Sequence, residues 1–206
     1  RGEIAVLDRV NPWDVARVGA MDHLNVEPYA VPTIHCLIPN PNRPLASSRS
    51  FRRALTYGID RQRILNQRLL REREDPDSMV ISGPLVRGAA SDDARGYGYN
   101  PQVEPRDFDP RMALTLATVG MTEATAALAK KEQAPPEKFT ISIAHAPTEV
   151  ATTACEEIAR YVQLLGVDVE LHALSSEINR AALENYDFLY AELALWEPIS
   201  DLWRLL

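Results

Sequence analysis

The clearest hydrophobic pattern of the chain lies in its last third. Apolar and polar residues alternate over 139–143, as in a β-strand with one buried face. Over 148–165 the apolar residues recur at helical spacing, and Gly166 ends this segment. Alternation returns over 167–171. This strand–helix–strand order predicts two parallel strands joined by a right-handed crossover. The helical stripe consists of Val150, Ala154, Ile158, Val162 and Leu165.

Two shorter helices are predicted over 50–70. The buried face of the first is formed by Phe51, Ala54, Leu55 and Gly58. Asp60 is suited to cap the second helix, and its apolar face consists of Ile64, Leu65 and Leu69. Five arginines lie over 61–73, but acidic residues follow directly. This mixture favours a solvated helix face over a surface for nucleic acid.

Weaker patterns predict the remaining elements before residue 132. We expect a helix over 13–21 and strands over 24–29 and 33–38, the second apolar enough to lie centrally in a sheet. Asp109 and the proline after it should open a helix that stops at Gly120. One or two further helical turns are expected after Gly120, over 123–131.

Three segments complete the organisation of the chain. Residues 75–108 contain many prolines and glycines and are expected to form a long, irregular surface segment. A helix is predicted over 176–184 and a buried strand over 186–195. Together with the strand–helix–strand unit, these elements indicate an α/β fold.

Composition limits the class of protein. The 206 residues, 46% hydrophobic and 25% charged, are typical of one soluble globular domain. A net charge of −7 argues against nucleic acid or an anionic membrane as a partner. No apolar run approaches the roughly 18 residues of a membrane span. The chain opens without a signal peptide and stops at Leu206 in an apolar stretch, which suggests a piece of a longer protein.

Candidate reactive groups are few. Cys36 and Cys155 are expected to be buried thiols, with a disulfide as the alternative in an exported protein. The four histidines share no metal-ligand spacing, so neither a metal nor a cofactor is expected. On a strand, His35 and Cys36 point to opposite faces and cannot act together as base and nucleophile. We therefore predict no enzymatic activity, with catalysis by carboxylates as a less favoured alternative.

The most specific segment covers residues 42–61. It reads N-R-P-L-A-S-S-R-S-F-R-R-A-L-T-Y-G-I-D-R and resembles the signature of the extracellular solute-binding proteins of family 5. These proteins are the peptide- and nickel-binding components of ABC importers. The residues that match in order are Arg53, Ala54, Leu55, Ile59, Asp60 and Arg61, whereas Gly58 stands where the family usually has alanine. Weaker matches follow in the family's order over 82–85, 109–120, 164–171 and 186–187.

The resemblance implies a fold and a function. The fold is one lobe of a type II periplasmic-binding-protein-like structure, a mixed sheet with helices on both faces, formed by residues 1–206. The function is binding of a peptide-like or other small solute, as one half of a two-lobe clamp that serves the permease subunits of an ABC importer. The location is periplasmic or extracellular, with or without a lipid anchor. The alternative is a ligand-sensing domain of a transcriptional regulator or signalling protein.

The resemblance also suggests where the solute binds. In the family, the strand after "Y-D" leads to the cleft, and in peptide-binding members its aspartate binds the ligand's α-ammonium group. Here that position is occupied by Trp196 or is deleted, so Glu192 or Glu197 would have to supply the charge. Trp196 is interpreted either as a packing residue or as a stacking surface for a flat ligand such as a sugar. Tyr97 and Tyr99 complete the candidate set, in a turn that either packs or cradles an anion.

Overall fold

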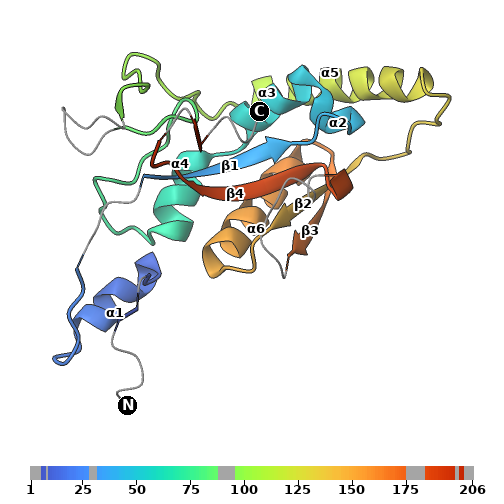
Figure 1. The fold of residues 1–206 in the computed structure, drawn as a ribbon. Helices are drawn as coiled ribbons and strands as arrows, with labels where there is room; N and C mark the ends of the chain where they lie inside the picture. Colours follow the sequence, from blue (N-terminus) through green and yellow to red (C-terminus); the bar gives the residue numbers. More distant parts are fainter. Residues whose placement is uncertain are drawn as a thin grey trace.

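A mixed β-sheet forms the centre of the computed structural model (Figure 1), which describes residues 6–7, 9–27, 32–87, 96–174, 184–197 and 200–201. Within these residues the sheet has four strands in the order β1-β4-β2-β3. Strand β2 runs parallel to β3 and β4, whereas β1 runs antiparallel to β4. The strands are β1 (Thr33–Pro39), β2 (Thr140–His145), β3 (Asp168–Ala173) and β4 (Phe188–Ala194).

The predicted strand–helix–strand unit is confirmed. Helix α6 (Glu149–Leu164) connects β2 to β3, and the two strands pair in parallel from Thr140 and Asp168 onward. Thr148 caps α6 by accepting a hydrogen bond from the Ala151 N–H at 3.2 Å. Gly166 follows the helix with a φ of +83°, a left-handed conformation that glycine adopts without strain.

Strand β1 corrects two predictions. Among the described residues β1 is an edge strand, because its one partner there is β4, and it is therefore not central. Its apolar character has another cause: Leu37 packs on the main core on one face, and Ile34 belongs to a second cluster on the other. The strand predicted over 24–29 is absent over 24–27, where Leu24 is exposed, and its last two residues lie outside the described residues.

Two of the described helices begin at the capping residues that the sequence predicts. The Asp60 carboxylate accepts the Arg63 N–H at 2.9 Å, and the Asp109 carboxylate accepts the Met112 N–H at 2.9 Å. Ser48 adds a third cap to the first signature helix. The helices before α6 are α1 (Val15–Gly19) with the 3-10 turn η1 (Pro12–Asp14), α2 (Pro44–Ser47), α3 (Arg49–Gly58), α4 (Arg61–Arg63) with the π-helical turn η2 (Ile64–Leu69), and α5 (Pro110–Ala129).

The second signature helix differs from its prediction. It consists of one α-helical turn, α4, followed by the π-helical η2, in which the Leu70 N–H bonds to the Leu65 carbonyl at 2.8 Å. The wider π turn changes which side chains face inward. As a result Ile64 and Leu70 are buried, while Leu65 and Leu69 are half-buried.

The prediction that the helix beginning at Pro110 stops at Gly120 is wrong. Helix α5 continues to Ala129 and includes the turns predicted separately over 123–131. Gly120 is buried against α3 at the point where the two helices cross, so its missing side chain allows close approach and does not end the helix. On α3, Gly58 likewise faces Ala113 of α5 and the Leu165 side chain.

Helix α5 bears on the membrane prediction. Of the described helices, α5 is long and apolar enough to cross a membrane when judged by length and composition alone. Its alanines and threonines keep the mean hydropathy at 1.3 without a continuous apolar run. Its buried stripe packs against α2 and α3, as in a helix of a globular domain. That stripe consists of Ala113, Ala117, Gly120 and Ala124.

Two apolar clusters lie on opposite faces of the sheet. The main core joins α3, α5 and α6 to β2 and β4, with Phe51 and Phe188 among its largest buried side chains. The smaller cluster contains Ile34, with Cys36 packed against it. Cys155 belongs to the main core, so the sheet separates the two thiols. Both cysteines are free, as predicted, and this arrangement rules out a disulfide between them.

Two parts of the chain lie outside the sheet and its two apolar clusters. Helix α1 lies apart from the sheet (Figure 1), and Trp13 contacts the Arg71 guanidinium, whose carbon lies 4.7 Å from the centre of the indole ring. Residues 75–87 and 97–108 contain no helix or strand, as predicted for 75–108.

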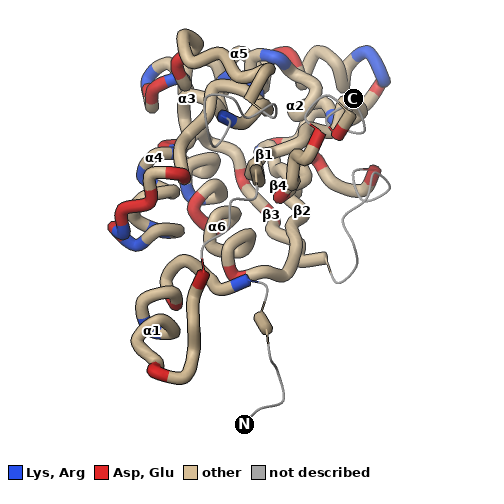
Figure 2. Tube along the Cα trace, turned by 60° about the vertical axis from the view of Figure 1, so that its left-hand side comes forward, with Lys and Arg blue, Asp and Glu red and all other residues tan. Residues whose placement is uncertain are grey.

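Around α4, basic and acidic residues lie close together (Figure 2), which fits the predicted solvated face. The helix predicted over 176–184 lies outside the described residues, except for its final residue.

Candidate functional site

The strand order identifies one edge of the sheet as the place for a ligand. From β2 the chain crosses through α6 to β3 on one side, whereas β4 lies on the other side of β2. The direction of the strand order therefore reverses next to β2. In open α/β sheets, ligands bind outside the carboxyl ends of the strands at such a reversal. The carboxyl ends of β2 and β4 are the corresponding position here.

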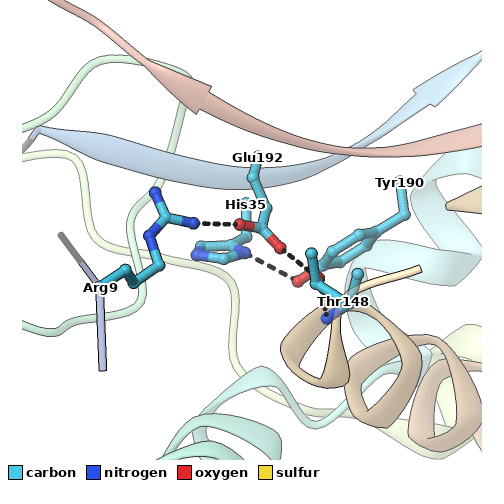
Figure 3. Close-up of polar contacts among 6 residues, drawn as sticks. Arg9, His35, Thr148, Tyr190 and Glu192 are labelled. Carbon is cyan, nitrogen blue, oxygen red and sulfur yellow. Dashed lines mark hydrogen bonds and ion pairs between the residues drawn. The ribbon is translucent and has the colours of Figure 1, made fainter. Parts of the chain in front are cut away.

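Strand β4 extends beyond β2 at this edge. The two strands pair at Ala144 and Leu189, after which the chain leaves β2 and enters α6 at Thr148. The remainder of β4 therefore passes the amino-terminal end of α6. The Thr148 hydroxyl donates a hydrogen bond to Glu192 Oε1 at 3.2 Å (Figure 3). The partial positive charge at this helix end also favours the Glu192 carboxylate.

The other oxygen of Glu192 contacts an arginine that is distant in sequence. Arg9 Nη1 lies 3.3 Å from Glu192 Oε2, with side-chain exposures of 66% for Arg9 and 17% for Glu192. Two residues later, Asn11 donates to Glu149 in the first turn of α6 at 3.1 Å. The segment before α1 is thus attached at the amino-terminal end of α6, and the charge of Glu192 is balanced by Arg9.

A histidine and a tyrosine lie beside this ion pair. Antiparallel pairing places His35 of β1 directly opposite Glu192, and Tyr190 lies two residues earlier on the same face of β4. His35 Nδ1 and Tyr190 Oη are 2.9 Å apart (Figure 3), and their ring centroids are 5.9 Å apart. We call Arg9, His35, Thr148, Tyr190 and Glu192 the polar cluster.

Burial changes the pKa values of both rings. The Tyr190 side chain is 4% exposed, and this burial raises the pKa of its hydroxyl, with the negative charge of Glu192 adding to the effect. Burial lowers the pKa of His35, because the surrounding protein disfavours the charged ring. Glu192 opposes this shift and Arg9 adds to it. Near neutral pH the cluster therefore contains a neutral histidine, a neutral tyrosine and one ion pair.

The structure places the five predicted site residues in different surroundings. Glu192 lies in the polar cluster, whereas Trp196 lies just beyond β4 with 58% of its surface exposed. Glu197 is exposed, and its N–H donates to the Asp201 carboxylate at 2.9 Å. Tyr97 is 58% exposed and Tyr99 is half-buried in a turn of the 96–108 segment. Pro198 and Trp203, near the same end of the chain, lie outside the described residues.

Sequence reasoning missed four members of the polar cluster. Alternation along 186–195 places Tyr190 and Glu192 on one face, so that pair could be found from the strand pattern. Thr148 was recognised as the start of a helix and not as a partner of Glu192. Arg9 and His35 carry no local signal, because their positions depend on pairing across more than 150 residues.

Two surface hollows lie elsewhere. The first, about 340 Å³, lies between α4 and the 104–108 segment and is lined by Asp60 and Arg61 among others. The second, about 420 Å³, lies near the amino-terminal end of β2 and includes Lys138 and Asp187 in its lining. Neither is lined by the polar cluster. No group of three or more His, Cys, Asp or Glu side chains in the described ranges could hold a metal ion.

Comparison with known proteins gives one family and one fold. The family model described as bacterial extracellular solute-binding proteins, family 5, middle region, matches residues 1–201. No curated protein sequence is significantly similar to the chain. The solved structures below share 13–17% sequence identity with it, which establishes a shared fold and nothing further.

Three solved structures illustrate this fold. The periplasmic binding protein DppA of Helicobacter pylori, in complex with the peptide STSA, matches with a TM-score of 0.63 and 17% identity, over 94% of this chain and 34% of its own. NikZ of Campylobacter jejuni, in complex with Ni(L-His), has a TM-score of 0.64 and 14% identity, over 90% and 34%. The oligopeptide-binding protein AppA of Bacillus subtilis, with a nonapeptide, has a TM-score of 0.62 and 13% identity, over 89% and 35%. The chain therefore spans about a third of the length of these structures.

Proposed function

The chain belongs to the bacterial extracellular solute-binding proteins of family 5, and we propose on this basis that it binds a small solute for an ABC importer. In this proposal the chain supplies one wall of the site, and the rest of a longer protein closes over it. The observation that carries the proposal is the position of the polar cluster, with Glu192 and Thr148 in contact at the carboxyl ends of β2 and β4.

The length of the chain supports a site that is built from two sides. A solute is desolvated only when protein surrounds most of it. The family relatives with this fold are about three times as long as the chain, which leaves room for a second wall. The 206-residue chain alone should therefore bind solutes poorly. Micromolar or tighter binding by the isolated chain, measured by calorimetry, would contradict this two-wall arrangement.

The state of Glu192 bears on the class of solute. A buried α-ammonium group needs a carboxylate partner, because an unpaired buried charge costs several kcal/mol. Glu192 already bonds to Arg9 and Thr148, and the exposed Glu197 is the other candidate carboxylate. We propose that the solute is not selected through a free amino terminus. Trp196, exposed just beyond β4, offers a flat surface on which a solute can stack.

The test compares free and N-acetylated peptides on the full-length protein, by calorimetry and thermal shift. We expect the free and the N-acetylated form of each peptide to bind with similar affinity. The alternative outcome that fits the proposal is that neither form binds, while another solute in the same screen does. The comparison is repeated with Glu192→Gln and Glu197→Gln. Strong preference for the free peptide, unaffected by either substitution, would show that a different carboxylate binds the ammonium group. A full-length protein that binds no peptide, sugar or metal chelate would contradict solute binding itself.

Three further properties belong to the proposal. The partners are the permease subunits of an ABC importer, reached by the full-length protein. The location is periplasmic or extracellular, which the name of the family supports, and a lipid anchor is one way to hold the protein there. The absence of enzymatic activity rests on the family's description, which is one of solute binding. Fractionation of cells that express the full-length protein tests the location directly.

A further inference from the structure

Tyr190 has one hydrogen-bond partner among the described residues, and that partner is His35. The contact joins Tyr190 Oη to His35 Nδ1 at 2.9 Å. Burial raises the pKa of the hydroxyl, so Tyr190 keeps its proton and has a hydrogen to donate. A buried hydroxyl hydrogen without an acceptor is unfavourable, so this hydrogen points to the nearest available lone pair. The described surroundings offer that lone pair on Nδ1 of the imidazole.

This contact determines which nitrogen of His35 carries the proton. A neutral imidazole has one protonated and one bare nitrogen. If Nδ1 accepts from Tyr190, the proton of the ring must be on Nε2. Figure 3 shows the second ring nitrogen on the side away from Tyr190, toward Arg9. Tyr190 covers the Nδ1 edge of the ring, and the residue as a whole is exposed, which leaves the Nε2 edge for a solute to contact.

We propose that the His35 Nε2–H, held in this tautomer by Tyr190, donates a hydrogen bond to a carboxylate of the solute. The inference rests on the proposed solute-binding function and specifies its chemistry. The neighbouring group is also a donor: Arg9 uses one nitrogen on Glu192, and its side chain is 66% exposed. A neutral N–H beside a guanidinium with remaining donors matches a carboxylate, which accepts through two oxygens.

The contacts of Glu192 reduce its repulsion of a second carboxylate. Both of its oxygens are occupied, one by Arg9 and one by Thr148, and its charge is balanced by Arg9. Glu192 therefore orients Arg9 and serves as a positioning residue. His35 lies directly opposite Glu192 in the register of β1 and β4. The two donors, His35 and Arg9, are therefore held by this pair of strands and by the segment that is attached to α6.

The tautomer is measured first, without any solute. In protein with ¹⁵N-labelled histidine at about pH 7.5, long-range ¹H–¹⁵N correlation spectra distinguish the two tautomers. We expect His35 in the Nε2–H form and the exposed His23, in the same spectrum, as an ordinary tautomer mixture. Tyr190→Phe removes the hydroxyl and keeps the ring, so it should return His35 toward a mixture. An Nδ1–H tautomer in the unaltered protein would overturn the proposal, whatever the variant does.

The ligand class is measured with acetate and acetamide, which have similar shape and different charge. Titration with acetate should shift the His35 Nε2–H resonance in a saturable way, while acetamide shifts it at least tenfold less at equal concentration. In variants without this imidazole, the backbone amide resonances of β1 and β4 next to position 35 report the response. There His35→Gln, which keeps an N–H donor, should retain part of the preference for acetate, whereas His35→Leu should lose it. Equal responses to both probes, or none to acetate, would overturn the proposal.

These outcomes are separate from those of the proposed function. A full-length protein that binds solutes from the screen while acetate and acetamide act alike would refute the carboxylate assignment alone. Selective acetate binding in a full-length protein that binds no solute would refute the transport function and leave the role of His35 intact.

Discussion

Gly120 of α5 lies directly against the backbone of Phe51 in α3. A Cβ atom built on Gly120 would lie 2.7 Å from the Phe51 Cβ and 2.8 Å from its backbone nitrogen. Real Cβ atoms do not approach other heavy atoms so closely, and one of the two contacts involves backbone that cannot rotate away. The two helices can therefore cross at this distance only while position 120 has no side chain.

Gly120→Ala should destabilise the fold by about 1–3 kcal/mol, the usual cost of overpacking a tight core. In an exposed helix the same change stabilises by up to about 1 kcal/mol, so a loss would show that the contact with Phe51 dominates. Gly19→Ala is the matched control, because nothing lies within 4 Å of a Cβ at position 19. Urea unfolding of both variants measures the difference, and an unchanged midpoint for Gly120→Ala would contradict the close crossing.

Arg61 should hold two irregular segments together. Its guanidinium donates to the Ile81 carbonyl at 3.2 Å and to the Arg106 carbonyl at 2.9 Å. Lysine has a single ammonium group and cannot reproduce this fork. Arg61→Lys should therefore cost about 1 kcal/mol and increase protease cleavage within 75–87 and 96–108.

The control for this experiment is Arg63→Lys on the same helix. Arg63 bonds through Nε to the exposed side chain of Gln67 at 3.0 Å. Limited proteolysis of the two variants, followed by mass spectrometry, locates the cuts. Equal cleavage rates in both would show that the segments are held by contacts other than those of Arg61.

The lowered pKa of His35 predicts a pH dependence of stability. Its ordinary value is 6.5, and the folded state takes up the proton only at lower pH, with Glu192, Arg9 and Tyr190 as the neighbouring titratable groups. Below about pH 6.5 the unfolded chain is protonated first, so the free energy of unfolding falls as pH decreases toward the folded pKa. Above pH 6.5 the His35 ring is neutral in both states, so the free energy of unfolding is not reduced by its protonation.

The measurement for His35 is a series of urea unfolding curves from about pH 7.5 to about pH 5. His35→Gln cannot titrate and should show a shallower loss of stability over this range. His23→Gln, which changes an exposed histidine, is the control for replacing a histidine by glutamine. A His35→Gln slope that matches the unaltered protein would mean that His35 has the same pKa in both states.

Both thiols should react slowly in the folded protein. Burial raises the pKa of Cys36 to about 11 and that of Cys155 to about 12, from an ordinary value of 9.0. The thiolate is the reactive form, so at pH 8 its population is lower by about 100-fold for Cys36 and about 1,000-fold for Cys155. Iodoacetamide should label neither thiol at the rate of a free cysteine, and both should label rapidly in urea. Rapid labelling of Cys36 in folded protein would show that β1 opens locally.

Local chemistry made part of the fold predictable. The caps at Asp60, Asp109 and Thr148 each depend on residues two or three positions away, so the sequence contains all the information needed. Gly120 was misread because glycine has two uses, ending a helix and allowing close packing. Only the position of Phe51 on another helix decides between them.

The candidate site was less predictable, because its contacts are distant in sequence. Glu192 was identified from its place near the end of a predicted strand, but its partner Arg9 is 183 residues away. His35 reaches Tyr190 only because β1 pairs with β4 in one particular register. Hydrophobic alternation defines the faces of each strand and does not determine which strands become neighbours.

The placement of β4 between β1 and β2 has a consequence for the order of folding. During synthesis β1 leaves the ribosome about 150 residues before its partner strand β4, as the 155-residue separation of His35 and Tyr190 shows. Until then β1 is an unpaired strand able to pair with another chain. Contacts so distant in sequence slow folding, since a long loop must close before they form. A chaperone that shields β1 during this interval should raise the yield of folded protein more than one that acts after release.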